Sequence, residues 1–350
     1  MDEVLDLPPG EVTVSLAKRA LRLATHMSFS TLQDELYHQH EVRLTDTVLD
    51  RLMQSVGQVA ERDQQAAVEK LEGLPEGVAR EERSSAKVPI ARPKRLYISC
   101  DGILYPTRYR QDRSDGGDGR RIVYQEMKCG SVFWQEGTSV WHKQCVASRE
   151  DVDRFGLRLW DLAVRCGMLQ AEEVIFISDG GTWPDSVAKH YFHDATRILD
   201  WFHASEHIWE AAYALYPDDP AAATRWAKPC ETTMRESSGI GLLRFLERSR
   251  CVRGGEADTS PTALRALDSL IEYIRPRLAI MDYVEYRDHG CAIGSGLMES
   301  TCKQLVAQRL KGSGRQWSEN GAVAMAALTV QRLNHTWEAF WASRPLQRAA

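Results

Sequence analysis

The sequence lacks any apolar stretch long enough to span a bilayer, which argues against a membrane-spanning protein. Its first residues, MDEVLDLPPGEV, are acidic and lack the basic-then-apolar order of a secretory signal. The 350 residues contain no internal repeat and no low-complexity tract. We therefore expect a cytoplasmic globular protein with no membrane partner, large enough to form two or three structural units.

The sequence also lacks a CxxC pair, so the spacing of a zinc ribbon is absent. Several cysteines lie within apolar runs, where a thiol behaves as a small hydrophobic group. We interpret all of them as reduced and structural. The eight residues are Cys100, Cys129, Cys145, Cys166, Cys230, Cys251, Cys291 and Cys302.

An excess of positive charge is missing as well. The chain has 44 Lys and Arg against 49 Asp and Glu, for a net charge of −5. Because phosphate binding relies on Lys and Arg, the average composition does not favour a nucleic-acid partner. Basic clusters do occur at Ala91-Arg-Pro-Lys-Arg95 and Arg309-Leu-Lys-Gly-Ser-Gly-Arg315. Taken alone, each is better explained as a solvated surface.

The N-terminal region, residues 1–60, has a helical pattern. Apolar residues recur at helical spacing from Asp46 to Val59, and Thr45 or Asp46 can cap that helix. An earlier helix start is indicated at Ser30-Thr31. Two short helices with a turn suit a DNA-binding helix-turn-helix, and they equally suit a helical hairpin for packing. Residues 61–92 are charged and poor in large apolar residues, which predicts an exposed helix and a linker.

Residues 93–200 have the pattern of a mixed α/β core. Runs rich in β-branched and aromatic residues predict strands, and the order of elements is β-β-β-α-β-α-β. The run Val174-Ile-Phe-Ile-Ser178 is continuously apolar, as in a strand covered on both faces. This order predicts a mixed sheet flanked by helices. The predicted strands are 95–101, 122–134, 139–147, 174–178 and 196–200, and the predicted helices are 154–168 and 185–192.

Residues 201–289 predict an all-helical insertion, with breaks at Pro217-Asp-Asp-Pro220 and Gly254-Gly255. Residues 290–350 are expected to complete the catalytic core. There a Gly-rich turn, Gly290-Cys-Ala-Ile-Gly-Ser-Gly296, opens a helix that carries Glu299. A last long helix is predicted from Ser318 to Asn334.

Three acids have the pattern of a phosphodiester-cutting site. Asp101 and Asp179 each follow an apolar run and precede glycine, and functional groups gather where the strands of an open sheet end. Two nearby carboxylates repel each other unless a cation lies between them. Mg²⁺ prefers oxygen ligands, and with Glu299 the set suits two ions that clamp the attacking and leaving oxygens. Each aspartate alone also fits a turn, because Asp-Gly is a common turn pair.

Four strings of the sequence carry a family likeness: Tyr97-Ile-Ser-Cys-Asp101-Gly102, Ile177-Ser-Asp179-Gly180-Gly181, Ile198-Leu-Asp200-Trp-Phe-His203-Ala-Ser-Glu206-His207 and Gly294-Ser-Gly296-Leu-Met-Glu299-Ser300. Together they resemble DDE transposases of bacterial insertion sequences. The likeness is greatest to the Kra-type group, which is related to Mutator-like transposases. It covers roughly residues 93 to 341 and continues after the last string through Lys303, Arg309, Lys311-Gly-Ser-Gly314, Trp317-Ser318 and Gly321-Ala322.

The resemblance implies a ribonuclease-H-like fold with an all-helical insertion before the last acid. It implies cutting at transposon ends and joining of the freed 3′-hydroxyl to target DNA, with two Mg²⁺ ions that Mn²⁺ can replace. Asp101, Asp179 and Glu299 match the catalytic, metal-binding acids. Asp200 and His203 match an Asp-x-x-His element beside the catalytic centre. Relatives in this group are usually longer at the N-terminus, so the resemblance predicts a shortened copy.

The implied partner is double-stranded DNA, both transposon ends and target, bound by a homo-oligomer. Lys303, Arg309, Lys311 and Arg315 would contact phosphates. Trp317 would stack on an unpaired base or, alternatively, pack in the core.

The sequence is compatible with several roles for His203. His203 and His207 are four residues apart, so they share a helix face and could bind a transition metal. Alternatively, His203 is a structural histidine, or it orients Asp200 or contacts DNA.

Other functions stay open. A related nuclease would cut DNA without joining it, and an inactive or domesticated truncated transposase would only bind DNA. A glycosidase also uses paired carboxylates. The Gly-Ser-Gly-x-x-Glu element and its basic flank give no reason to prefer that activity.

Overall fold

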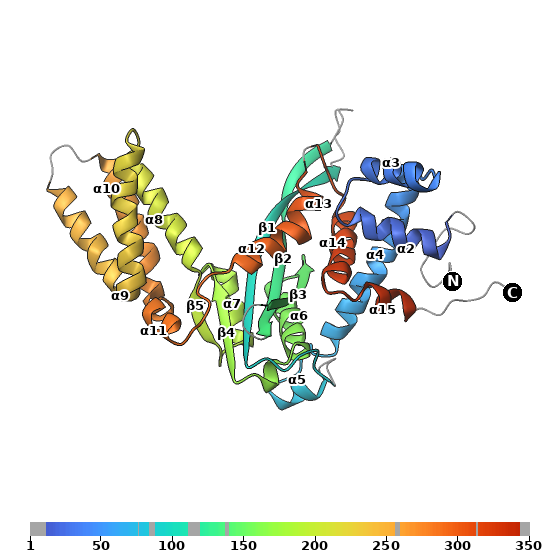
Figure 1. The fold of residues 1–350 in the computed structure, drawn as a ribbon, viewed down its shortest axis with the longest axis horizontal. Helices are drawn as coiled ribbons and strands as arrows, with labels where there is room; N and C mark the ends of the chain where they lie inside the picture. The colour runs from blue at the N-terminus through green and yellow to red at the C-terminus, as the bar shows by residue number, and fades with distance from the viewer. Residues whose placement is uncertain are drawn as a thin grey trace. The chain divides into compact units, whose positions relative to one another are not determined.

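The structure is a computed structural model that describes residues 12–75, 77–83, 88–110, 120–136, 140–255, 260–312 and 314–343. The chain forms two compact units, and each is described by itself. The core unit takes its residues from Met1–Val174, His190–Phe192 and Leu297–Ala350. The helical unit takes them from Ile175–Lys189 and His193–Gly296. Figure 1 labels the helices and strands.

A mixed five-stranded sheet has the strand order β3-β2-β1-β4-β5. The strands β1 (Arg95–Arg110), β2 (Arg120–Glu136) and β3 (Val140–Ser148) are antiparallel neighbours. The strands β4 (Glu173–Ser178) and β5 (Thr196–Leu199) are parallel to each other. The predicted α/β class is confirmed, and the arrangement is consistent with a ribonuclease-H-like fold.

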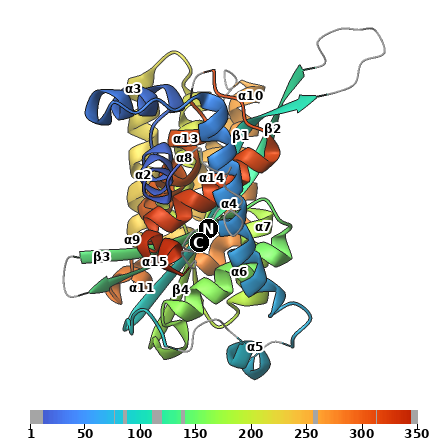
Figure 2. The same cartoon turned by 90° about the vertical axis from the view of Figure 1, so that its right-hand side faces the viewer.

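One detail of the predicted sheet is wrong: β1 does not end at Asp101. It continues to Arg110, because residues after Asp101 pair with β2, beginning with Gly102 opposite Lys128. Side chains alternate along this extension, with Tyr105 buried and Leu104 exposed. Figure 2 shows the two strands running on together as a ribbon. Asp101 therefore lies within a strand, whereas Asp179 does follow the end of β4 directly.

Three helices open the core unit: α2 (Val14–Ala24), α3 (Phe29–His40) and α4 (Asp46–Glu69). The hydroxyl of Thr45 accepts a hydrogen bond from the Val48 N–H at 3.3 Å, so Thr45 is the cap. Helix α4 is longer than predicted and packs along α14 (Glu319–Leu333). The approach is close, because a Cβ placed on Gly57 would lie 2.5 Å from the Ala324 carbonyl oxygen.

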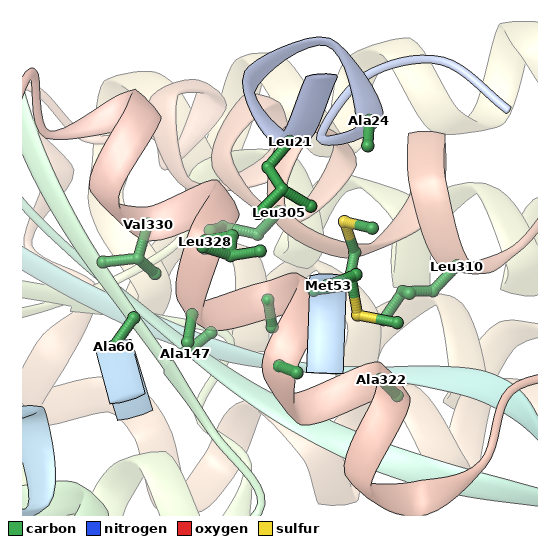
Figure 3. Packing of buried hydrophobic residues seen from close by; sticks show 14 of the residues in the cluster. Leu21, Ala24, Met53, Ala60, Ala147, Leu305, Leu310, Ala322, Leu328 and Val330 are labelled. Carbon is green, nitrogen blue, oxygen red and sulfur yellow. The ribbon is translucent and has the colours of Figure 1, made fainter. Parts of the chain in front are cut away.

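The hydrophobic cluster of the core unit joins segments from both ends of the chain (Figure 3). Leu21 of α2 and Met53 of α4 pack with Leu305 and Leu328 from the C-terminal segments. The face of the sheet that carries Cys129 also contributes to this cluster. Helix α15 (Trp337–Ala342) contributes Trp337, Phe340 and Trp341 to this cluster. The other elements of the core unit are α5 (Val78–Arg83), α6 (Val152–Arg165) and the 3-10 turn Met168–Gln170.

The helical unit contains most of β4 and all of β5, and the described residues of 201–289 within it are almost wholly helical, as predicted. In α9, the residues Ser237 and Ser238 have non-helical backbone angles, which kinks the helix. The Ser238 hydroxyl donates to Asp282 at 2.7 Å at this kink. The helices are α7 (Thr182–Tyr191), which extends into the core unit, α8 (Trp201–Leu215), α9 (Pro220–Gly254), α10 (Pro261–Ile274), the 3-10 segment η2 (Arg275–Ile280) and α11 (Tyr283–Asp288).

The Gly-rich turn does open a helix that carries Glu299, namely α12 (Gly296–Cys302). A π-helical segment, η3 (Lys303–Ala307), and the short α13 (Gln308–Leu310) follow it. The predicted last long helix is α14, with Ser318 as its cap. Among the described residues, no helix combines the length and apolar character required to cross a membrane.

Candidate active site

In the core unit, Asp101 and α12 are in direct contact. The Asp101 Oδ1 accepts the Gly102 N–H at 2.6 Å, and its Oδ2 lies 3.9 Å from the Sγ of Cys302. Glu299 precedes Cys302 by three residues on α12, and residues three apart share a helix face with roughly 5–6 Å between their Cβ atoms. Glu299 therefore lies on the side of α12 that meets Asp101. Its side chain is exposed and has no hydrogen bond or ion pair among the described residues.

The thiol of Cys129, beside Asp101, is held in the neutral form. Cys129 lies opposite Asp101 in the sheet, and its hydrogen bond with Cys302, together with burial, raises the pKa of its thiol well above the usual range. Burial likewise raises the pKa of Cys145 to about 12. Thiolates are the form in which cysteine binds metals, so this neutral environment leaves the carboxylates as the ligands of choice. The eight cysteines, all within the described residues, are thiols and not disulfides, and seven of them are buried while Cys251 is exposed.

In the helical unit, two side chains clamp the turn that carries Asp179. The Tyr273 hydroxyl donates to the Asp179 carbonyl oxygen at 3.1 Å, and the Arg277 Nη2 donates to the Gly180 carbonyl oxygen at 2.8 Å. Gly180 has a φ of +73°, and a Cβ there would lie 2.5 Å from the Arg277 Nε. The Asp179 Oδ1 accepts the Gly181 N–H at 2.8 Å. The turn is therefore fixed, and the Asp179 carboxylate stays half-exposed.

Two histidines of α8 extend this clamp. The His207 ring lies 4.0 Å from the Tyr273 ring, and His203 meets His207 edge-on at 4.9 Å. Burial and the neighbouring His203 lower the pKa of His207, so it stays neutral at pH 7. The guanidinium of Arg277 lies over the Tyr273 ring, 4.2 Å from the centre of that ring.

Asp200 ties the start of α8 to the Gly-rich turn. It is buried, and its Oδ1 accepts the N–H groups of Phe202 and Ser295, both at 3.1 Å. Its Oδ2 accepts the Ser295 hydroxyl, and the Trp201 N–H donates to the Ile293 carbonyl oxygen at 2.9 Å. Asp200 thus fixes the residues immediately before α12, the helix of Glu299.

We expect replacement of Tyr273 with phenylalanine to loosen the Asp179 turn. The change removes one hydrogen bond, worth about 1 kcal/mol, and should speed local exchange of the Gly181 amide about fivefold. Hydrogen exchange followed by NMR measures this. Tyr286→Phe is the control, since Tyr286 donates to Arg197 in the same unit at 3.1 Å. Unchanged exchange at Gly181 in the Tyr273 variant would contradict the clamp.

The basic residues of the C-terminal segment have different environments. Lys303 and Lys311 are exposed, and Arg315 is half-buried. Arg309 and Trp317 are buried, with 3% and 8% of their surface exposed. Trp317 pairs with Thr107 of β1 as an isolated β-bridge, so it packs within the core unit.

The structure divides the predicted acids between the two units: Asp101 and Glu299 belong to the core unit, and Asp179 and Asp200 to the helical unit. Within the part of the chain that the structure describes, no group of three or more His, Cys, Asp or Glu side chains is arranged to hold a metal ion.

Sequence reasoning missed Tyr273, Arg277 and Ser295. Ser295 lies within the Gly-Ser-Gly string and could have been noticed there. Tyr273 and Arg277 carry no local signal, because they are ordinary residues of a helical stretch far along the chain from Asp179.

Solved structures include chains that are similar to this one. No protein-family model and no curated protein matches the chain. The chain is similar to the Drosophila P element transposase in its strand transfer complex, with 10% sequence identity and a TM-score of 0.30. The match covers 95% of this chain and 82% of that one. At this identity and score the likeness assigns no activity to the chain.

Proposed function

We propose that the chain is a DDE-type transposase, a magnesium-dependent enzyme that cuts DNA and joins a 3′-hydroxyl to target DNA. Asp101, Asp179 and Glu299 are its metal ligands. One observation carries the proposal: Cys302 touches Asp101, and Glu299 lies one turn earlier on the same face of α12. This contact supports Asp101 and Glu299, which lie far apart in the sequence, as ligands of one cation.

The donor atoms fit a hard cation. All three proposed ligands are carboxylates, which Mg²⁺ prefers, and the Cys129 thiol opposite Asp101 is neutral. Glu299 and Asp179 keep exposed or half-exposed carboxylates. When bound, the ions activate water or the 3′-hydroxyl and stabilise the departing oxygen.

The surrounding residues hold the acids and the DNA. Tyr273 and Arg277 fix the Asp179 turn, so the carboxylate loses little freedom on binding a cation. Asp200 fixes the turn before Glu299. The exposed Lys303 and Lys311 contact phosphates of the DNA backbone.

We expect Glu299→Gln to weaken binding of Mn²⁺ or Mg²⁺ roughly tenfold or more, because it removes one charged oxygen ligand. Titration calorimetry on the full chain measures this. The matched control is Glu338→Gln, an exposed acid of the core unit with a side chain 75% exposed. Equal metal affinity in the Glu299 variant and the wild type would remove Glu299 from the site.

A joining assay separates the proposed activity from its alternatives. The substrate is a pre-cut DNA end with a free 3′-hydroxyl, offered together with target DNA and Mg²⁺. A transposase joins the two, and Asp101→Asn prevents it. Cleavage of DNA without joining would identify a nuclease, and binding without either reaction would identify a non-catalytic DNA-binding protein.

A further inference from the structure

A polar pocket in the core unit lies between the N-terminal helices and the segment before α14. It has a volume of about 640 Å³. The walls come from the starts of α3 and α4, from β1, and from residues 314–318. Three arginines line it, Arg108, Arg309 and Arg315, with Asp46 and Asp50 on the α4 side.

Arg309 is the buried member of this set and is held in one orientation. Its guanidinium lies between two aromatic rings, 5.0 Å from the centre of Phe29 and 4.7 Å from the centre of Trp317. Its Nε donates to the Ala24 carbonyl oxygen at 2.7 Å. Arg309 lines the pocket, and no hydrogen bond from its Nη1 or Nη2 is found among the described residues.

Among the described residues, no carboxylate forms an ion pair with Arg309. Burial, and then the nearby Arg315, lower the pKa of Arg309 to about 10, so it stays charged at pH 7. Within the described part of the chain, neither Asp46 nor Asp50 forms an ion pair with a pocket arginine; Asp46 accepts from Gln33 and Asp50 from Gln54. A buried charge without a partner is costly, and a bound anion removes that cost.

The rim arginines are fixed by backbone groups. The Arg315 Nη1 donates to the carbonyl oxygens of Gln308 and Arg309, at 2.8 and 3.1 Å. The Arg108 Nη2 donates to the Gln316 carbonyl oxygen at 3.3 Å. Guanidinium groups held in this way suit the tetrahedral oxygens of phosphate, which they bind through paired hydrogen bonds.

We propose that this pocket binds one backbone phosphate of DNA, with Arg309 as the central contact and Arg108 and Arg315 at the rim. The inference deepens the proposed function, since DNA is the ligand, but it needs none of the metal-binding acids. The pocket joins α3 and α4 to the segment that follows the catalytic helix α12. A phosphate held there fixes the DNA to both parts of the core unit.

The first test measures the melting temperature of the full chain with inorganic phosphate, relative to chloride at equal ionic strength and with EDTA present. Phosphate should raise the wild-type value by about 2 °C. Arg309→Met should abolish the rise and Arg108→Gln should reduce it. The control, Arg62→Gln, alters an exposed arginine of α4 outside the pocket and should keep the rise. For each variant, the melting temperature in phosphate is compared with the melting temperature of the same variant in chloride, so any change in stability caused by the substitution itself cancels.

The second test follows the affinity for a 30-base-pair duplex against salt concentration, again with EDTA. Arg309→Met removes one phosphate contact, so the negative slope of log K against log salt should become shallower by about 1. Binding at low salt should weaken roughly tenfold. If Arg309→Met does not fold, the phosphate response and the salt slope of Arg108→Gln test the proposal in its place. An unchanged phosphate response and slope would overturn the proposal. Loss of the phosphate response with an unchanged slope would show a free-phosphate site and overturn the DNA assignment. Because no metal is present, a failure of metal-dependent cleavage leaves both results standing.

Discussion

Replacing Asp179 with asparagine is expected to abolish magnesium-dependent cleavage of DNA and leave the fold intact. The charge of this carboxylate is what a divalent cation needs, and its loss should slow cleavage at least about 10³-fold, or about 4 kcal/mol of barrier. The fold is spared because asparagine keeps an oxygen for the Gly181 N–H. The clamp from Tyr273 contacts the backbone of residue 179 and does not depend on the side chain.

Cleavage rates of a labelled duplex, together with melting curves, check this expectation. Asp194→Asn is the matched control, since Asp194 is an acid of the helical unit with a side chain 94% exposed. The control should cut at the wild-type rate if the chain is an active copy. Cleavage by the Asp179 variant at a rate close to wild type in magnesium would refute its assignment as a metal ligand.

The largest effect on stability is expected at Arg158 of α6. Only 3% of its surface is exposed, and its Nη2 and Nη1 donate to Glu61 of α4 at 2.7 and 3.1 Å. The Nη2 also donates to Glu150 at 2.5 Å. Arg158→Ala leaves a buried Glu61 without its partner and should lower the free energy of unfolding by about 3–5 kcal/mol. Urea unfolding measures this.

Two comparisons test whether the unpaired charge of Glu61 causes this loss of stability. Arg154→Ala, on the same helix, removes ion pairs from a side chain that is 31% exposed and should cost at most about 1 kcal/mol. The double variant Arg158→Met with Glu61→Met should be more stable than Arg158→Ala, since the lone buried acid is gone. A single-variant loss below 1 kcal/mol would mean that the pair does not hold α4 to α6.

The sequence by itself determined the local features of this protein. Periodicity predicted the mixed sheet and the helical stretch after β5, because alternation and helical spacing record which side of one segment is buried. Thr45 and Ser318 cap helices where short-range signals placed the helix starts. The Gly-rich turn before Glu299 was also visible, since glycine gives the backbone the freedom that a sharp entry into a helix requires.

Only the tertiary structure determined the features that depend on contacts between segments distant in the sequence. β1 runs past Asp101 because a second strand supplies hydrogen-bond partners for residues 102–110. Arg309 is a buried guanidinium between two rings, although its sequence context resembles a solvated basic cluster. Tyr273 reaches Asp179 from 94 residues away along the chain. Such contacts leave no local pattern, because the energy of a hydrogen bond or a buried charge depends on the partner and not on the neighbouring residues in sequence.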